Sequence, residues 1–144
     1  MILISHRGNL KGKVSGYEND PGYIDEALNK GYEVEIDVWY KDEEWYLGHD
    51  EPRYGINLEY LKHDKFWCHA KNIEALNKML ERDIHCFWHQ EDDVTLTSKG
   101  YMWTYPGKEL THKSIAVLPE INNDIPKKCL GICSDFVVNY KELR

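Results

Sequence analysis

Short apolar runs bounded by polar segments recur along the first ninety residues of the chain. The clearest is YEVEIDVWY, residues 32–40, in which acidic and aliphatic side chains alternate. Alternation with a period of two is typical of a β-strand, because successive side chains point to opposite faces. Similar runs predict four more strands, at residues 1–5, 45–49 (a hairpin return from 32–40), 65–71 and 84–89.

Two segments between these runs have helical signals. Residues 19–31 place Asp20 as a cap, Pro21 in the first turn and Gly31 at the end of a predicted helix. Residues 72–83 form the clearest amphipathic pattern. Its apolar stripe is predicted to consist of Ile73, Leu76, Met79 and Leu80.

Helical periodicity fades in the second half, where residues 101–107, 114–120 and 131–138 predict short strands joined by loops. Strands that alternate with helices favour an α/β fold with a parallel sheet or barrel. A full eight-fold barrel usually takes about 250 residues. The 144 residues therefore predict one domain, residues 1–144, folded as a reduced TIM-like (β/α) barrel with several outer helices shortened or missing.

Composition narrows the choice of partners. The net charge of −7 argues against a basic surface for nucleic acid or anionic lipid. The apolar runs are too short to span a bilayer, and the start of the chain lacks the features of a signal peptide. The four cysteines include no CxxC pair, so free, buried thiols are expected. We expect a cytoplasmic protein without stable membrane insertion, which needs local cations or a metal ion if its substrate is anionic.

Candidate chemical groups gather near the C-terminal ends of the predicted strands, where active sites assemble in parallel α/β folds. Histidines exchange protons near neutral pH, carboxylates hold divalent cations, and Arg and Lys bind phosphate oxygens. Together these groups predict phosphoester chemistry. They are His6, Arg7, Glu35, Asp37, His49, Asp50, His69 and Lys71.

Several short motifs occur in a fixed order along the chain. They are HRG at 6–8, EN at 18–19, EID at 35–37, HD at 49–50, AK at 70–71, WTYP at 103–106 and GICSDF at 131–136. In this order they resemble the glycerophosphodiester phosphodiesterase family. That family belongs to a superfamily of barrel enzymes that also contains the phosphatidylinositol-specific phospholipases C.

The resemblance implies a divalent metal ion held by Glu35 and Asp37, most often Mg²⁺ or Ca²⁺ in relatives. It differs at one position, because His69 stands where the family usually has a third acidic ligand. His69 is a candidate ligand against the alternative of a packed neutral histidine, and imidazole suits Zn²⁺ or Mn²⁺ better than Ca²⁺. Glu33 is expected to remain a solvated or bottom-face charge outside the metal site.

The resemblance also implies roles around the phosphorus. His6 and His49 would form the acid/base pair. Other residues would bind the phosphate oxygens (Arg7 and Lys71), line the pocket against the alcohol (Trp103) and support the site (Glu18). From the strand pattern, His89 is a further candidate to face the pocket.

These observations predict metal-dependent hydrolysis of a small, glycerophosphodiester-like phosphodiester by histidine acid/base catalysis. One alternative is a non-catalytic barrel that binds a phosphate or phosphodiester. Another is a phosphodiesterase for a phosphoinositide or a sugar-phosphate diester. The sequence leaves the alcohol, the ion and the oligomeric state open.

Overall fold

A computed structural model describes residues 1–144. Ten strands form one curled sheet: β1 (Ile2–His6), β2 (Glu33–Lys41), β3 (Glu44–Leu47), β4 (Tyr54–Ile56), β5 (Phe66–Ala70), β6 (Cys86–Phe87), β7 (Val94–Leu96), β8 (Met102–Thr104), β9 (Ser114–Val117) and β10 (Gly131–Ser134). The helices are α1 (Pro21–Asn29), α2 (Leu58–Leu61) and α3 (Ile73–Glu81), with 3-10 helices η1 (Pro119–Asn122) and η2 (Val137–Leu143). None of the helices has the length and apolarity needed to cross a membrane.

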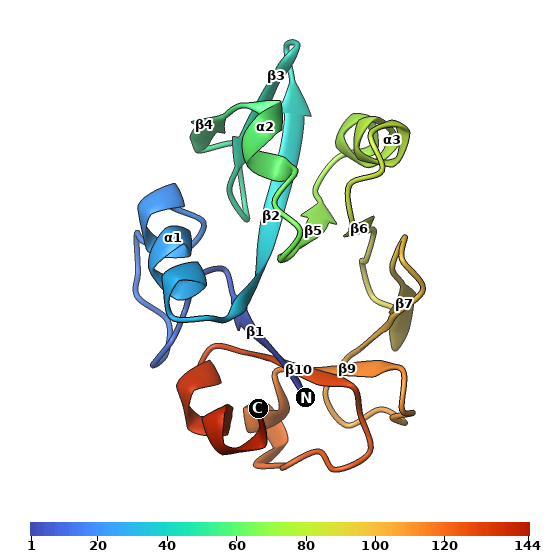
Figure 1. Ribbon diagram of the computed structural model, residues 1–144. Helices are drawn as coiled ribbons and strands as arrows, with labels where there is room; N and C mark the ends of the chain where they lie inside the picture. The colour runs from blue at the N-terminus through green and yellow to red at the C-terminus, as the bar shows by residue number, and fades with distance from the viewer.

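Seven of the strands run parallel, in the order β6-β5-β2-β1-β10-β9-β8. Figure 1 shows the sheet curling around a common interior, with α1, α2 and α3 outside it. No ladder joins β6 to β8; at this seam the Ser98 amide donates to the Cys86 carbonyl oxygen at 2.8 Å. The chain is therefore a mixed α/β fold with a strongly curled sheet and few helices.

The middle of β2 decides where the hairpin lies. Val38 pairs with Leu47 of antiparallel β3 and with Ala70 of parallel β5, so these strands occupy opposite edges of β2. The edge taken by β3 is the one that pairs with β1 nearer the start of β2. As a result, the chain that follows β3 passes over the C-terminal end of β1.

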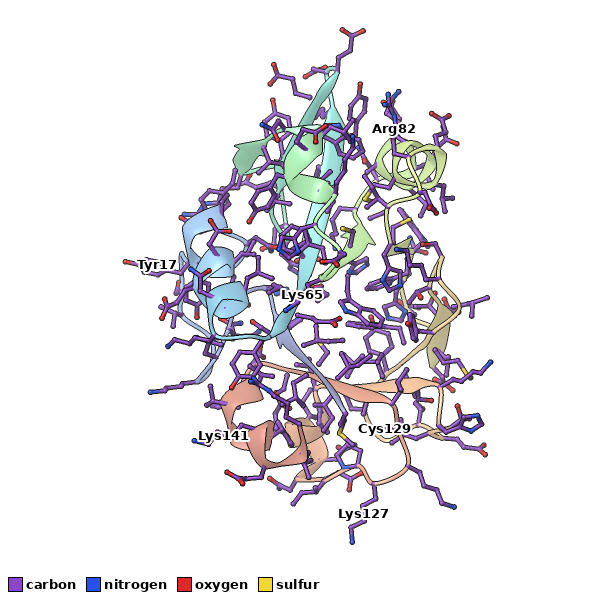
Figure 2. The ribbon with its side chains drawn as sticks, in the orientation of Figure 1. Tyr17, Lys65, Arg82, Lys127, Cys129 and Lys141 are labelled. Carbon is purple, nitrogen blue, oxygen red and sulfur yellow. The ribbon has the colours of Figure 1, made fainter.

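Alternation along β2 separates two environments. Val34, Ile36 and Val38 belong to the larger apolar core, which includes buried side chains of α1 and α3. A smaller cluster, which includes Trp67 and Trp103, fills the inside of the curl. In Figure 2 side chains occupy the space enclosed by the strands, whereas exposed residues such as Tyr17, Arg82 and Lys127 point outward.

The first helix begins and ends as its sequence predicts. Asp20 is the N-cap and accepts a hydrogen bond from the Gly22 amide at 2.8 Å, with Pro21 in the first turn. Gly31 follows the helix with φ of 88°, a conformation that glycine adopts without strain. The prediction of free cysteines is also confirmed, and three of the four are buried.

Several predictions about the elements are wrong, and one of them is the strand predicted at 114–120, which ends at Val117 because Pro119 and Glu120 belong to η1. In α3, Ile73 and Leu80 are 65% and 53% exposed, because the helix turns Ala75 and Met79 toward the sheet instead. A small alanine at this face lets the helix backbone approach the strands. The predicted strand 131–138 ends at Ser134, and the following residues form η2.

Candidate functional site

A cavity of about 440 Å³ opens at the C-terminal ends of the parallel strands. Eight residues singled out in the sequence line it: His6, Arg7, Glu35, His49, His69, Lys71, His89 and Trp103. Additional lining comes from Gln90, Tyr105, Val117 and Leu118. The structure therefore brings side chains from distant parts of the chain to one site, because neighbouring parallel strands end at the same edge of the sheet.

Glu35, Asp37 and His69 form one group of possible metal ligands. Each offers an atom that lies within 4.8 Å of the others, and both carboxylates are almost completely buried. Asp37 and His69 are direct neighbours across β2 and β5, with Asp37 Oδ1 3.3 Å from His69 Nδ1. Glu35 Oε1 and Asp37 Oδ1 have no hydrogen-bond partner. Buried acceptor atoms without a donor are costly unless a cation satisfies them.

The orientation of His69 also suits a cation. Its Nε2 lies 3.3 Å from the His89 carbonyl oxygen and can donate to it, which leaves a lone pair on Nδ1 facing Asp37 Oδ1. Two ligand atoms that bind one ion at about 2.1 Å lie roughly 3.0–3.4 Å apart. The three side chains thus fit a divalent ion, and their one imidazole and two carboxylates fit Mn²⁺ or Zn²⁺ as well as Mg²⁺.

The two carboxyl groups of β2 respond in opposite directions to their surroundings. Burial, reinforced by the charge of Asp37, raises the pKa of Glu35 well above its usual value. Burial also acts to raise the pKa of Asp37, but the neighbouring imidazoles of His49 and His69 and the charge of Arg7 hold it well below the usual value. Asp37 is therefore the anionic centre of the site.

Arg7 links the acidic centre to His49. It adopts a left-handed conformation with φ of 58°, and its amide donates to the Glu35 carbonyl oxygen at 2.9 Å. Its Nε lies 3.1 Å from Asp37 Oδ2, and its Nη2 donates to His49 Nδ1 at 2.9 Å. Glu18 Oε2 lies 3.7 Å from Nη1, so this carboxylate flanks the guanidinium from outside the cavity.

His6 is oriented by Asp135, which the sequence reasoning did not single out. His6 Nδ1 lies 2.7 Å from Asp135 Oδ1, and that oxygen also accepts from Asn9 Nδ2 at 2.9 Å. Burial acts to raise the pKa of Asp135, but the bond with His6 outweighs it and the pKa is lowered. The pairing of Ser5 with Ser134 explains this contact, because the residues that follow them must also be neighbours.

Asn19 is a second residue that was missed. Its carboxamide donates to Asp37 Oδ2 and accepts from the Asp37 amide, both at 2.9 Å. It is fully buried and left-handed, with φ of 67°. Its place in the EN motif beside Glu18 was the available signal.

The remaining aromatic and acidic side chains define the limits of the site. His89 stacks on Tyr105 with ring centroids 3.7 Å apart, and both rings line the cavity. Trp103 is 2% exposed and forms part of the cavity wall. Glu33 lies at the other end of β2, half-buried, and accepts from the Trp67 indole at 2.5 Å.

Comparisons of the chain with models of protein families, with curated proteins and with solved structures found no match. What the site does is therefore inferred from its chemistry. Each of the HRG, EID and HD motifs contributes lining to one cavity, through His6 and Arg7, Glu35 and His49 respectively, and Arg7 contacts His49. Basic, acidic and imidazole groups are thus all within reach of one small ligand.

Proposed function

We propose that this chain hydrolyses a glycerophosphodiester-like phosphodiester in a metal-dependent reaction, within a reduced TIM-like barrel. One observation carries the proposal. Two of the four histidines that line the cavity, His6 and His49, have different partners at Nδ1, an acceptor for His6 and a donor for His49, and these favour different tautomers of the ring. General acid/base catalysis of ester hydrolysis needs this pairing of one proton acceptor and one proton donor.

His6 is the base in this proposal. Asp135 Oδ1 is acceptor-only when ionised, so the short contact at 2.7 Å places the ring proton on His6 Nδ1. The lone pair of Nε2 is then free to take a proton from the attacking hydroxyl. That hydroxyl belongs to water, or to the substrate alcohol itself, in which case a cyclic phosphate forms first and is then hydrolysed.

His49 is the acid. Arginine has no acceptor atom, so Arg7 must donate to His49 Nδ1, and the ring proton lies on Nε2. To pass this proton to the oxygen of the departing alcohol, the ring must first gain a second proton on Nδ1, which lies 3.6 Å from Asp37 Oδ2, because a neutral imidazole that lost its only proton would become an anion. Each turnover moves one proton onto His6 and one off His49, and solvent exchange restores both.

The charge of the reaction centre is balanced by Glu35, Asp37, His69, Arg7 and Lys71. The first three would hold the divalent ion, which when bound stabilises negative charge on the phosphate oxygens. Lys71 lines the cavity without an ion-pair partner and is positioned to bind a non-bridging oxygen. Arg7 combines the same role with fixing His49.

The test is an assay on glycerophosphodiesters after chelation and return of Mg²⁺, Mn²⁺, Ca²⁺ or Zn²⁺ in turn. His6→Ala and His49→Ala should each lower kcat at least about 100-fold, because each removes a proton-transfer group. His112→Ala, at an exposed loop position, is the matched control and should retain activity. Full activity in either site variant would contradict the assigned roles.

A non-catalytic barrel that binds a phosphate or phosphodiester is the second candidate. His69 in place of an acid supports it, because one negative charge fewer weakens a site for a hard cation. Calorimetry that detects phosphate binding, with no hydrolysis of any diester under any metal, would favour this function. The first proposal also has a variant, in which the substrate is a phosphoinositide or a sugar-phosphate diester. A panel of diester substrates would distinguish this variant from hydrolysis of a glycerophosphodiester.

A further inference from the structure

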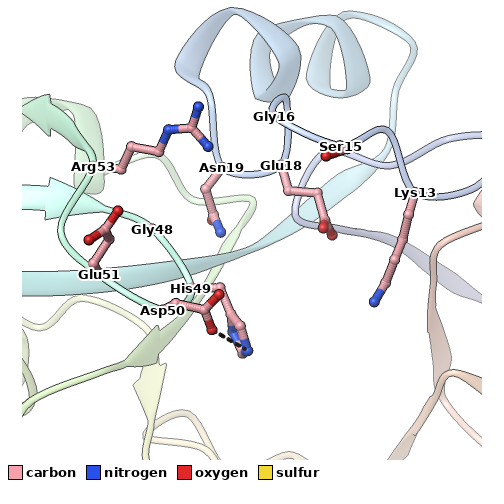
Figure 3. A pocket seen from close by; sticks show the side chains of 10 residues that line it. All are labelled: Lys13, Ser15, Gly16, Glu18, Asn19, Gly48, His49, Asp50, Glu51 and Arg53. Carbon is pink, nitrogen blue, oxygen red and sulfur yellow. Dashed lines mark ion pairs between the residues drawn. The ribbon is translucent and has the colours of Figure 1, made fainter.

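A second cavity, of about 420 Å³, adjoins the candidate site at His49. It lies between residues 13–19, which connect β1 to α1, and residues 48–53, which connect β3 to β4 (Figure 3). Its volume falls in the range of about 300–1,000 Å³ that is typical of small-molecule sites. No hydrophobic residue lines it, and its ten residues are Lys13, Ser15, Gly16, Glu18, Asn19, Gly48, His49, Asp50, Glu51 and Arg53.

The two walls of this cavity are held in place by hydrogen bonds. The Tyr54 hydroxyl donates to the Gly16 carbonyl oxygen at 2.9 Å and so connects the two loops across the rim. The Trp39 indole donates to the Gly48 carbonyl oxygen at 2.7 Å and fixes the second loop on β2. Only glycine fits at position 48, because the Cβ of any other residue would collide with the carbonyl oxygen of Glu51. The cavity is therefore a built feature of the fold.

His49 borders both cavities, so the second cavity lies next to the proposed general acid. A general acid must lie beside the oxygen of the departing alcohol. The first cavity holds the phosphate-binding cations and the candidate metal ligands, so an alcohol released past His49 enters the second cavity. This step rests on the proposed function.

We propose that the second cavity is the subsite for the leaving alcohol and that this alcohol is polyhydroxylated, as in a polyol or sugar. Figure 3 shows Lys13, Glu18, Asn19 and His49 pointing into the same space. Lys13 and Arg53 form no ion pair, so their donors are available to a ligand. Each hydroxyl of a polyol both donates and accepts, and it matches a wall of interspersed cations and carboxylates.

The same lining disfavours the other common alcohols. An acyl chain would bury apolar surface against a wall that has no hydrophobic residue. A trimethylammonium group is recognised by aromatic cages, and no Phe, Tyr or Trp lines this cavity. A second phosphate would face the carboxylates of Glu18, Asp50 and Glu51.

The first experiment compares hydrolysis of glycerophosphoinositol with that of glycerophosphocholine. We expect kcat/KM to be at least about tenfold higher for the inositol ester, with the difference mainly in KM. Lys13→Met should reduce this ratio several-fold, because it removes a donor that only a hydroxylated alcohol uses. Lys11→Met is the matched control, since Lys11 lies on the same loop but lines neither cavity, and it should leave the ratio unchanged.

The second experiment measures binding alone and so separates the subsite from catalysis. Calorimetry on the folded His6→Ala variant should give a lower Kd for glycerophosphoinositol than for glycerophosphocholine. Lys13→Met in the same background should remove that difference. Equal affinities for the two esters would overturn the subsite even if both are hydrolysed. Selective binding without hydrolysis by the unmodified chain would instead overturn the proposed function and keep the subsite.

Discussion

At the scale of single residues, the site depends on pairs that fix one another. Asn19 holds Asp37 through two hydrogen bonds, and Asp135 holds His6 through one. In each case the partner bonds to one polar atom of the functional side chain, Asp37 Oδ2 or His6 Nδ1, and leaves the other polar atom free. The free atoms, Asp37 Oδ1 and His6 Nε2, are the ones to which chemistry is assigned.

His69 decides which ions the site prefers. Replacing it by glutamate should raise affinity for Ca²⁺ and lower affinity for Zn²⁺, because carboxylate oxygen suits the harder ion. We expect the ratio of Zn²⁺ to Ca²⁺ affinity to fall at least about tenfold. Calorimetry on chelator-treated protein measures both constants without an activity assay.

His63→Glu is the control for this change, because it adds the same charge at an exposed position outside the cavity. A ratio that stays the same in His69→Glu would show that His69 is a packed histidine rather than a ligand.

At the scale of elements, turns at the ends of strands determine where the functional groups lie. Gly8 follows the HRG histidine with φ of 91°, and a Cβ there would lie 2.6 Å from the Tyr23 ring. The tight approach brings the loop after β1 against α1. Tyr23 in turn donates to Asn9 Oδ1 at 3.0 Å, next to the carboxylate that orients His6.

Gly8→Ala should therefore destabilise the fold by about 2–4 kcal/mol, through both backbone strain and collision with Tyr23. Gly100→Ala provides the comparison, because Gly100 has φ of 89° but nothing within 4 Å of its Cβ position. It should cost only about 1 kcal/mol for the strain. Urea unfolding of both variants measures the difference, and equal losses would rule out the steric part.

At the scale of the whole molecule, His85 couples stability to pH. Its ring is buried beside Trp67 and Tyr101, and its Nε2 lies 2.8 Å from Thr97 Oγ1. That hydroxyl already accepts from the Tyr101 amide, so its proton is free to donate to the imidazole. Burial, aided by the charge of Lys99, lowers the pKa of His85 to about 4.

The sign of the effect follows from this pKa. Between about pH 6.5 and pH 4 the unfolded chain binds a proton at this histidine and the folded chain does not, so stability falls as the pH drops through that window. The loss is at most about 1.4 kcal/mol per pH unit and is reduced by solvent screening. Urea unfolding at about pH 7 and pH 5 should show a smaller loss for His85→Gln than for the unmodified chain. An identical loss in both would contradict the assignment.

The sequence alone determined several local elements and most of the residues of the candidate site. The alternation in residues 32–40 and the capping residues of α1 act through neighbours in the chain, so they could be predicted without knowledge of the fold. The ordered motifs singled out His6, Glu35, Asp37 and His49, and these side chains share one site in the structure, although Glu35 and Asp37 lie within β2 rather than at its end. Periodicity failed for α3, because the choice of buried face depends on how closely a helix approaches the sheet.

Only the tertiary structure decided the partners. Asp135 orients His6 because β10 pairs with β1, a contact across 129 positions of the chain. The position of β3 on the β1 edge of β2 brings His49 to Arg7 and creates the second cavity. Such contacts depend on which strands become neighbours, and strand order is set by the packing of the whole sheet rather than by any local pattern.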